Sequence, residues 1–342
     1  MTAVPMEIVP HDLNIDFLGK RRLWFGLSIS LIVLGMVATA FWGMPVGIDF
    51  AGGTEFQLRF DDGVSVDESK LREVAVGAGF RDAEVVRFGE ADSTEFLIKF
   101  KADPEDEAAA SAAGETDGLA ANTRVARLQA AIRDSIGSFV EQRVEFVGPK
   151  VGADLRRDGA NAMLVSAIAI LIYIAFRFSS RYAPGAVVAL IHDVFVTSGI
   201  LVIANHLGLR VEFDLQVLAA LLAIVGYSLN DTIIIYDRIR ENLEVNPTAD
   251  LVKVLNASVN QTMSRTVLTS GTTLLAVVAL LVFGGAVIFP FSFTMLIGIV
   301  VGTYSSIFIA SPILLFLEQR YGDRGKPGVP GRTPAKVRGA RV

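Results

Sequence analysis

Asp231 is the residue of this sequence whose position most strongly suggests chemistry. With Asn230 it lies in an apolar run from Leu215 to Tyr236, which is long enough to span a membrane. A carboxylate at the centre of such a helix costs on the order of 3 kcal/mol to insert, so it needs a partner, water or a proton. We interpret Asp231 as a proton-binding carboxylate. The alternative is an acid that reaches the cytoplasmic interface near Arg238.

Arg265 is the natural ion partner for that carboxylate. It belongs to a polar stripe at helical spacing that also contains Ser258, Thr262, Thr266, Thr269 and Thr272. A hydroxyl stripe that continues into an apolar run is typical of a helix face that packs against other helices or lines water. The alternative is an interfacial arginine placed by the positive-inside rule.

Two further features lie inside apolar runs. His192 and Asp193 are near the middle of the run 182–207 and either belong to a proton path or form a structural pair bonded to each other or to a neighbouring helix. Small residues also recur at every fourth position: Gly298, Gly302, Ser306 and Ala310. This spacing predicts a seam for close helix packing, more often within one chain than between subunits.

Catalytic groups of the usual kinds do not occur together. The sequence has no cysteine, and its three histidines, His11, His192 and His206, are scattered. The glycines at 47–53 are not followed by the lysine of a phosphate-binding loop. We therefore expect no enzyme activity, no metal site, no cofactor and no nucleic-acid partner.

The composition places these groups in a membrane protein. Of 342 residues, 52% are hydrophobic, and the mean hydropathy is +0.49. Long uncharged runs predict six membrane-spanning helices in an α-helical bundle. They cover residues 23–44, 159–178, 182–207, 215–236, 266–287 and 293–317. The remaining segments are a polar N-terminus (1–22), a charged connection (237–265) and a basic tail (318–342) that we expect to be disordered.

Residues 45–158 predict a soluble domain between the first two spans. Its alternating and helical patterns give the order β-α-β-β-α-β, which is typical of a ferredoxin-like α+β fold. The predicted elements are 54–60, 67–79, 83–88, 94–100, 119–137 and 143–147. An insert at 101–121 has few large apolar residues, so we expect it to be flexible.

Six spans place both termini on one side of the membrane. Most basic residues that flank the spans fall on that side, whereas Arg156 and Arg157 lie on the other, next to Asp154 and Asp158. The positive-inside rule then predicts cytoplasmic termini and a soluble domain outside the cytoplasm.

Several motifs resemble the SecD/SecF family of protein-export membrane subunits, within the resistance-nodulation-division transporters. The segments 47–54 (GIDFAGGT) and 147–152 (VGPKVG), where the chain leaves and re-enters the membrane, are similar to its linker motifs. The segments 226–232 (GYSLNDT), 237–242 (DRIREN) and 256–270, which contains QTMSRT, are most similar to the SecF branch. The likeness covers almost everything except the termini and the insert.

The resemblance implies a role in protein export. SecD would supply six more spans, and the pair would act in the bacterial inner membrane with the SecYEG channel and the SecA motor, and with YajC and YidC. The proton-motive force would drive motion of the periplasmic domain that pulls or holds the translocating preprotein. Asp231 and Arg265 would match the family's proton site, to which SecD adds an acid.

The linkers 47–53 and 148–155 would then act as hinges between the domain and the membrane. The motif residues concerned are Gly47, Asp49, Gly52, Gly53, Gly148 and Pro149. Two other functions fit the sequence: half of a proton-coupled efflux transporter for small molecules, or a structural stabiliser of the export channel that uses no protons.

Overall fold

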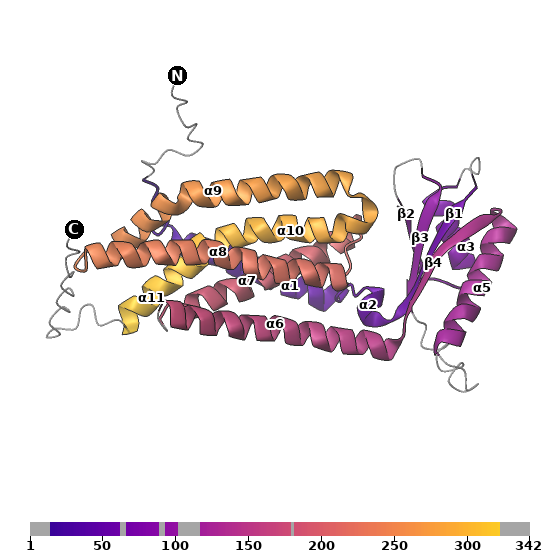
Figure 1. The fold of residues 1–342 in the computed structure, drawn as a ribbon, viewed down its shortest axis with the longest axis horizontal. Coiled ribbons are helices and arrows are strands. Elements are labelled where there is room, and N and C mark those ends of the chain that lie inside the picture. Colours follow the sequence, from indigo (N-terminus) through magenta and orange to yellow (C-terminus); the bar gives the residue numbers. More distant parts are fainter. Residues whose placement is uncertain (1–13, 62–65, 89–92, 102–116, 179–180, 322–342) are drawn as a thin grey trace, which may run out of the picture.

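The computed structural model describes residues 14–61, 66–88, 93–101, 117–178 and 181–321. These residues form a long helical bundle with a small sheet domain at one end (Figure 1). The first described residue precedes α1, and α11 ends the described chain. Both lie at the end of the bundle opposite the sheet domain.

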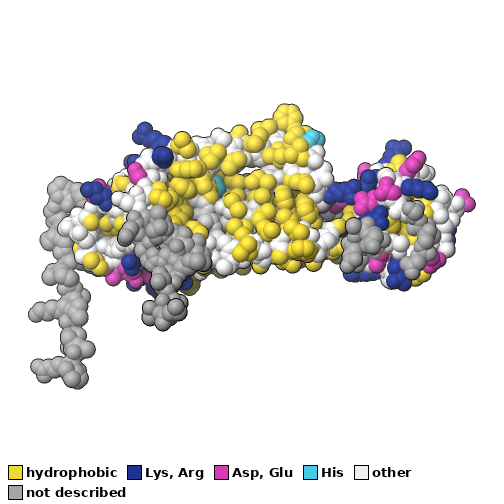
Figure 2. Space-filling view, turned by 90° about the horizontal axis from the view of Figure 1, so that it is seen from above, with side chains coloured by type: hydrophobic (Ala, Val, Ile, Leu, Met, Phe, Trp, Pro, Cys, Tyr) yellow, Lys and Arg dark blue, Asp and Glu magenta, His cyan; other side chains and the backbone are white. Residues whose placement is uncertain are grey.

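Among these described residues, six helices are long and apolar enough to cross a membrane, which confirms the predicted number of spans. The bundle consists of α1 (Arg21–Trp42), α6 (Pro149–Arg177), α7 (Ala183–Ala204), α8 (Leu215–Val245), α9 (Leu251–Phe283) and α10 (Gly285–Ser305). Two π-helical turns, η1 (Asn205–Leu209) and η2 (Ser306–Ala310), extend α7 and α10, and α11 (Ser311–Tyr321) follows η2. Figure 2 shows hydrophobic side chains along this bundle and charged ones toward its ends and on the sheet domain.

Several helix ends differ from the predicted span ends. The helix predicted from residue 159 begins at Pro149, which occupies the first turn, where its missing N–H costs nothing. The charged connection 237–265 is mostly helical, because α8 continues to Val245 and Asp250 caps α9. Hydropathy detects the edge of the apolar layer, whereas capping chemistry sets where the helix ends.

The last two spans also shift. The predicted span 266–287 ends early, at Phe283, because Gly285 has a positive φ of 71° that breaks the helix. The predicted span 293–317 is part of a longer helical segment from Gly285 to Tyr321. Residues 318–321 are therefore helical, and the rest of the predicted tail, like residues 1–13, lies outside the described residues.

The sheet domain has the predicted ferredoxin-like order. It contains β1 (Gly53–Phe60), α3 (Glu68–Gly77), β2 (Glu84–Phe88), β3 (Glu95–Lys101), α5 (Asp117–Ser135) and β4 (Phe139–Val147). All strand pairs are antiparallel, in the order β2-β3-β1-β4. Alternate β1 residues Phe56, Leu58 and Phe60 are buried in its core.

Two details of the domain differ from the prediction. β4 begins at Phe139 rather than at 143, because its first residues pair with the end of β1 past a bulge at Gln57 and Leu58. The predicted insert loses its ends to regular structure, since Lys101 belongs to β3 and α5 begins at Asp117. Residues 102–116 lie outside the described residues.

The small-residue seam packs inside the chain. A Cβ on Gly302 would lie 2.9 Å from the Ser228 Cβ, and one on Gly298 would overlap Ile224, so α10 approaches α8 closely. At a second crossing, a Cβ on Gly199 of α7 would lie 2.7 Å from the Cα of Gly35 on α1. Backbone contacts this close tolerate no side chain at all.

We therefore expect Gly199→Ala to force α1 away from α7. Overpacking of this kind costs about 1–3 kcal/mol, so the variant should unfold at a lower temperature than the natural chain in detergent. Gly26→Ala on α1 is the matched control, because its added Cβ would meet no atom within 4 Å. Equal unfolding midpoints for the two variants would contradict the backbone contact.

Candidate functional site

Asp231 lies inside the bundle, where three helices meet. Its side chain is 1% exposed, and its Oδ2 accepts a hydrogen bond from Ser270 Oγ of α9 at 3.4 Å. The Ser270 hydroxyl is also 2.8 Å from Thr303 Oγ1 of α10, and either hydroxyl can donate to the other. Among the described residues, the carboxylate thus accepts one long hydrogen bond. Its donor, the Ser270 hydroxyl, can donate instead to Thr303, at the shorter distance. Such a group is poorly fixed in its ionised form.

Arg265 does not form within this chain the direct ion pair with Asp231 that the sequence suggested. Its side chain is exposed, and it forms no ion pair with Asp231 in the described part of the chain, although it is close enough to attract that carboxylate electrostatically. The reason is the register of α9, in which residues four apart share a face. The buried face carries Ser258, Thr262, Thr266 and Ser270. Arg265 lies beside that face and points out of the chain.

The supporting residues predicted around Asp231 form no hydrogen bond with its carboxylate in the described part of the chain. Asn230 is exposed. Thr262 and Thr269 donate to carbonyl oxygens of their own helix, and Thr266 is buried with no partner for its hydroxyl among the described residues. The group that does reach Asp231 is Ser270, which sequence reasoning missed. The four-residue spacing from Thr262 through Thr266 would have found it.

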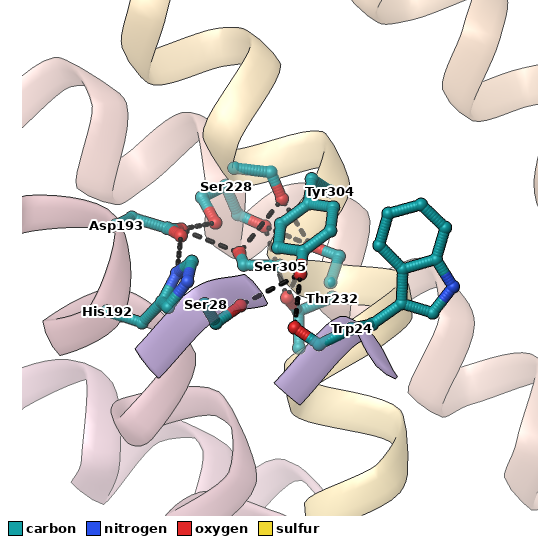
Figure 3. A network of polar contacts seen from close by, with 10 residues as sticks. Trp24, Ser28, His192, Asp193, Ser228, Thr232, Tyr304 and Ser305 are labelled. Atoms are coloured by element: carbon teal, nitrogen blue, oxygen red, sulfur yellow. Dashed lines mark hydrogen bonds and ion pairs between the residues drawn. The ribbon is translucent and has the colours of Figure 1, made fainter. Parts of the chain in front are cut away.

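His192 and Asp193 form a second buried polar centre on α7 (Figure 3). Asp193 is 0% exposed. Its Oδ2 accepts from Ser228 Oγ of α8 at 2.6 Å and from Ser305 Oγ of α10 at 2.8 Å, and its Oδ1 lies 3.0 Å from His192 Nδ1. One carboxylate therefore joins three helices. Ser228 and Ser305 were not predicted, because nothing in their sequence context distinguishes them from other small residues.

Hydroxyl contacts extend this centre in two directions. The Thr232 hydroxyl is 2.8 Å from that of Ser306, and Tyr304 Oη lies 2.8 Å from Ser28 Oγ on α1. Ser228, which donates to Asp193 of α7, precedes Asp231 by less than one turn on α8, so this helix links the two buried carboxylates.

The linker motifs form a close-packed joint at the domain end of the bundle. The first is not a simple turn, because it contains the short helix α2 (Ile48–Ala51). The Asp49 Oδ2 accepts from the backbone N–H of Leu215 at 3.0 Å and so adds a second contact at the start of α8, whose N-cap residue is Asp214. The Gly47 N–H donates to the carbonyl of Phe213 at 2.9 Å.

The second motif packs directly on the first. A Cβ on Gly152 would lie 3.1 Å from the carbonyl oxygen of Phe50, and one on Gly52, at φ 85°, would lie 3.0 Å from the Cα of Pro149. Gly53, at φ 159°, is equally crowded by the carbonyl of Phe100. Gly148 caps α6 in an extended conformation. The segment 148–155 is thus the first part of a helix rather than a flexible link.

Charged residues surround a cavity between the sheet and the bundle. Its volume is about 670 Å³, and Asp49, Glu84, Lys99 and Asp214 line it. Burial raises the pKa of Glu84 and of Asp214. For Lys99 the effect of burial is outweighed by four acidic neighbours, which raise its pKa. Ion pairs of Lys101 with Glu212 (3.3 Å) and of Arg210 with Glu68 (3.3 Å) also join the domain to the loop before α8.

Comparison with known proteins accounts for this combination of a six-helix bundle, a ferredoxin-like domain and two linker motifs. Residues 127–320 match the family model for the C-terminal part of the protein export membrane proteins SecD and SecF. The chain belongs to the SecD/SecF family. Residues 43–64 match the SecD/SecF GG motif, a segment that includes Asp49 and three glycines of the joint, Gly47, Gly52 and Gly53.

Relatives within the SecD/SecF family match over nearly their full length. The protein translocase subunit SecF of Calditerrivibrio nitroreducens is 40% identical over 317 residues, 92% of this chain and 97% of the relative. The SecF of Pseudomonas aeruginosa is 42% identical, over 89% and 92% of the two chains. The crystal structure of SecDF from Thermus thermophilus, described as a translocon-associated membrane protein, is 34% identical with a TM-score of 0.73. The structural alignment includes 91% of this chain but only 39% of the longer SecDF chain.

Proposed function

We propose that this chain is a SecF-like subunit of the bacterial Sec protein translocase, which pairs with SecD and uses the proton-motive force to promote late translocation of preproteins. Six apolar helices support a multi-pass membrane location. The basic flanks favour the inner membrane with both termini cytoplasmic and the sheet domain periplasmic. Protons are the coupling ion in this proposal, and no enzyme activity or cofactor is assigned.

The observation that carries the proton-coupled part is the buried, weakly bonded Asp231. A proton that crosses 100 mV supplies about 2.3 kcal/mol, and one pH unit adds about 1.4 kcal/mol. Free energies of this size shift a two-state equilibrium strongly. The test is export in cells that depend on this chain, with and without a collapsed proton gradient.

We assign the SecD contact to the exposed polar side of α8 and α9. Gly226 and Asn230 on α8, and Arg265 and Thr272 on α9, are exposed although they lie on membrane-spanning helices. Polar groups that face lipid are costly, so this side requires a protein partner. In this arrangement Arg265 lies between Asp231 and an acid that SecD supplies.

Cysteine cross-linking tests this face, because the natural chain has no cysteine. Asn230→Cys should cross-link to single cysteines placed on the membrane helices of SecD. Leu164→Cys on α6, whose wild-type side chain is 60% exposed, is the control and should stay unlinked. Equal cross-linking of both positions would reject the assigned face.

The joint at the linkers is the route by which α8 moves the periplasmic domain. Because Asp49 accepts from the first amide of α8, and Gly52 and Gly152 allow α2 to pack directly on α6, a displacement of α8 is passed to the first residues of β1. We therefore treat the linkers 47–53 and 148–155 as a rigid connection between the bundle and the sheet domain, called the strut below, rather than as flexible hinges. The SecYEG channel, the SecA motor, YajC, YidC and the preprotein are the further partners of this proposal.

Asp49→Ala tests the strut. Loss of the hydrogen bond to the Leu215 amide costs about 0.5–1.5 kcal/mol, so the variant should loosen the start of α8 and reduce export. The side-chain oxygen of asparagine can accept the same hydrogen bond, so Asp49→Asn should retain export. The direct measurement is hydrogen exchange of the Leu215 amide, which should become faster only in the alanine variant, while the Val217 amide, bonded to Asp214, should be unchanged. Unchanged exchange of the Leu215 amide would show that this hydrogen bond does not hold α8.

A further inference from the structure

The buried pair His192 and Asp193 is placed to do more than tie three helices together. We propose that it is a second proton-binding site, in which His192 relays a proton to Asp193. This inference rests on the proposed proton-coupled function of Asp231 and adds a separate exchangeable proton on α7.

The first observation is the unequal environment of the two imidazole nitrogens. Nδ1 lies 3.0 Å from Asp193 Oδ1, whereas Nε2 is buried and has no hydrogen-bond partner among the described residues. The side chain is 5% exposed. A structural histidine normally uses its second nitrogen to fix one tautomer. Here Nε2 is the atom at which a proton can be added or removed without breaking any hydrogen bond of the network.

The second observation is that Asp193 accommodates both charge states without repacking. When ionised, the carboxylate accepts from His192, Ser228 and Ser305. When it is protonated on Oδ1, the same 3.0 Å contact serves with the donor reversed. The Ser305 hydroxyl has an alternative acceptor, the carbonyl oxygen of Gly302 at 3.1 Å. When Asp193 is neutral, this hydroxyl can therefore donate to Gly302 instead of to the carboxyl group.

The relay balances as follows. A proton binds to His192 Nε2, and the proton on Nδ1 passes to Asp193 Oδ1. The N–H bond at Nδ1 breaks as an O–H bond forms, and the imidazole remains neutral with its tautomer exchanged. The net charge of the pair changes from −1 to 0. Because an unbalanced charge is costly inside a membrane bundle, release of this proton must be coupled to a change in packing or in charge nearby.

The surrounding helices offer few other titratable groups. Tyr304 of α10 has its ring 6.0 Å from the His192 ring, and Asp231 follows Ser228 on α8. Helix α1 contributes Ser28 and the carbonyl of Trp24 through Tyr304, neither of which titrates near neutral pH. On α6 the apolar stretch is flanked by Asp158 and Arg177, and the charged residues of α11 are Glu318 and Arg320, near its end. Asp231 is thus the charge most directly linked to the pair.

Nitrogen NMR of histidine tests the relay in the full chain with SecD in lipid vesicles. Because only three histidines occur, a chain with His11→Gln and His206→Gln carries His192 as its single reporter. When the pair takes up its proton as the pH is lowered, His192 should change from the Nδ1–H to the Nε2–H neutral tautomer. Asp193→Asn should remove this exchange. Thr197→Val, a buried hydroxyl one turn away with no partner among the described residues, is the control and should preserve it.

The same tautomer throughout the pH range, or a doubly protonated ring that forms equally with and without Asp193, would overturn the relay. The tautomer measurement does not depend on export. With Asp231→Asn in the same chain, a persistent tautomer exchange beside lost export identifies two separate sites. Normal export in that variant would reject the proposed function and leave the relay standing.

Discussion

Replacing Asp231 with asparagine is expected to abolish the stimulation of preprotein export by the proton gradient. Asparagine has nearly the same volume and can still accept a hydrogen bond from Ser270, so the packing of α8 against α9 and α10 should persist. What the variant loses is the ability to bind and release a proton. Export should fall to the level of cells without the chain, and SecD should still co-purify.

The measurement is export in a depleted strain that carries either form, with and without an agent that collapses the proton gradient. The natural chain should lose its advantage when the gradient is collapsed, whereas Asp231→Asn should show no such advantage at any time. If the asparagine chain supports gradient-dependent export, the function of a structural stabiliser, in which no proton is used, becomes the better account. Export of small molecules in the same cells separates the efflux alternative.

Arg265→Gln is expected to reduce gradient-dependent export about as much as Asp231→Asn does, but for a different reason. The guanidinium is exposed on the isolated chain, yet it is close enough to attract Asp231. In the pair with SecD it would balance whichever acid is ionised, and removal of one member of a buried charge group costs about 3–5 kcal/mol. We expect the gradient-dependent part of export to be lost.

A lysine at the same position provides the matched control. Lys keeps the charge but lacks the planar fork of five donors, so Arg265→Lys should restore only part of the stimulation. Co-purification of SecD should be unchanged in both variants, because the assigned face extends over two helices. Full stimulation with glutamine at this position would remove Arg265 from the site.

The sequence was sufficient for the number of spans and the order of the sheet. Six long apolar runs leave few arrangements other than six spanning helices, and the alternation of Phe56, Leu58 and Phe60 is a strong strand signal. The predicted helix ends were less accurate, because helices continue as amphipathic turns beyond the apolar run that predicts the span. The continuation of α8 to Val245 is the clearest case.

The site was predicted only in part, and the reason is geometric. A helical period of 3.6 lets adjacent residues such as Arg265 and Thr266 be assigned to one stripe, although only Thr266 is buried. Contacts across helices, such as Ser228 and Ser305 with Asp193, depend on how three helices cross. That arrangement follows from close approaches like Gly302 on Ser228, which spacing along one helix does not specify.

Proton uptake by the purified complex tests the central claim most directly. Vesicles that contain this chain with SecD would be exposed to an imposed pH gradient, and a trapped pH-sensitive dye would report proton entry. We expect gradient-driven proton movement with the natural chain and, with Asp231→Asn, none above the rate of empty vesicles. Equal proton movement with both chains would contradict it.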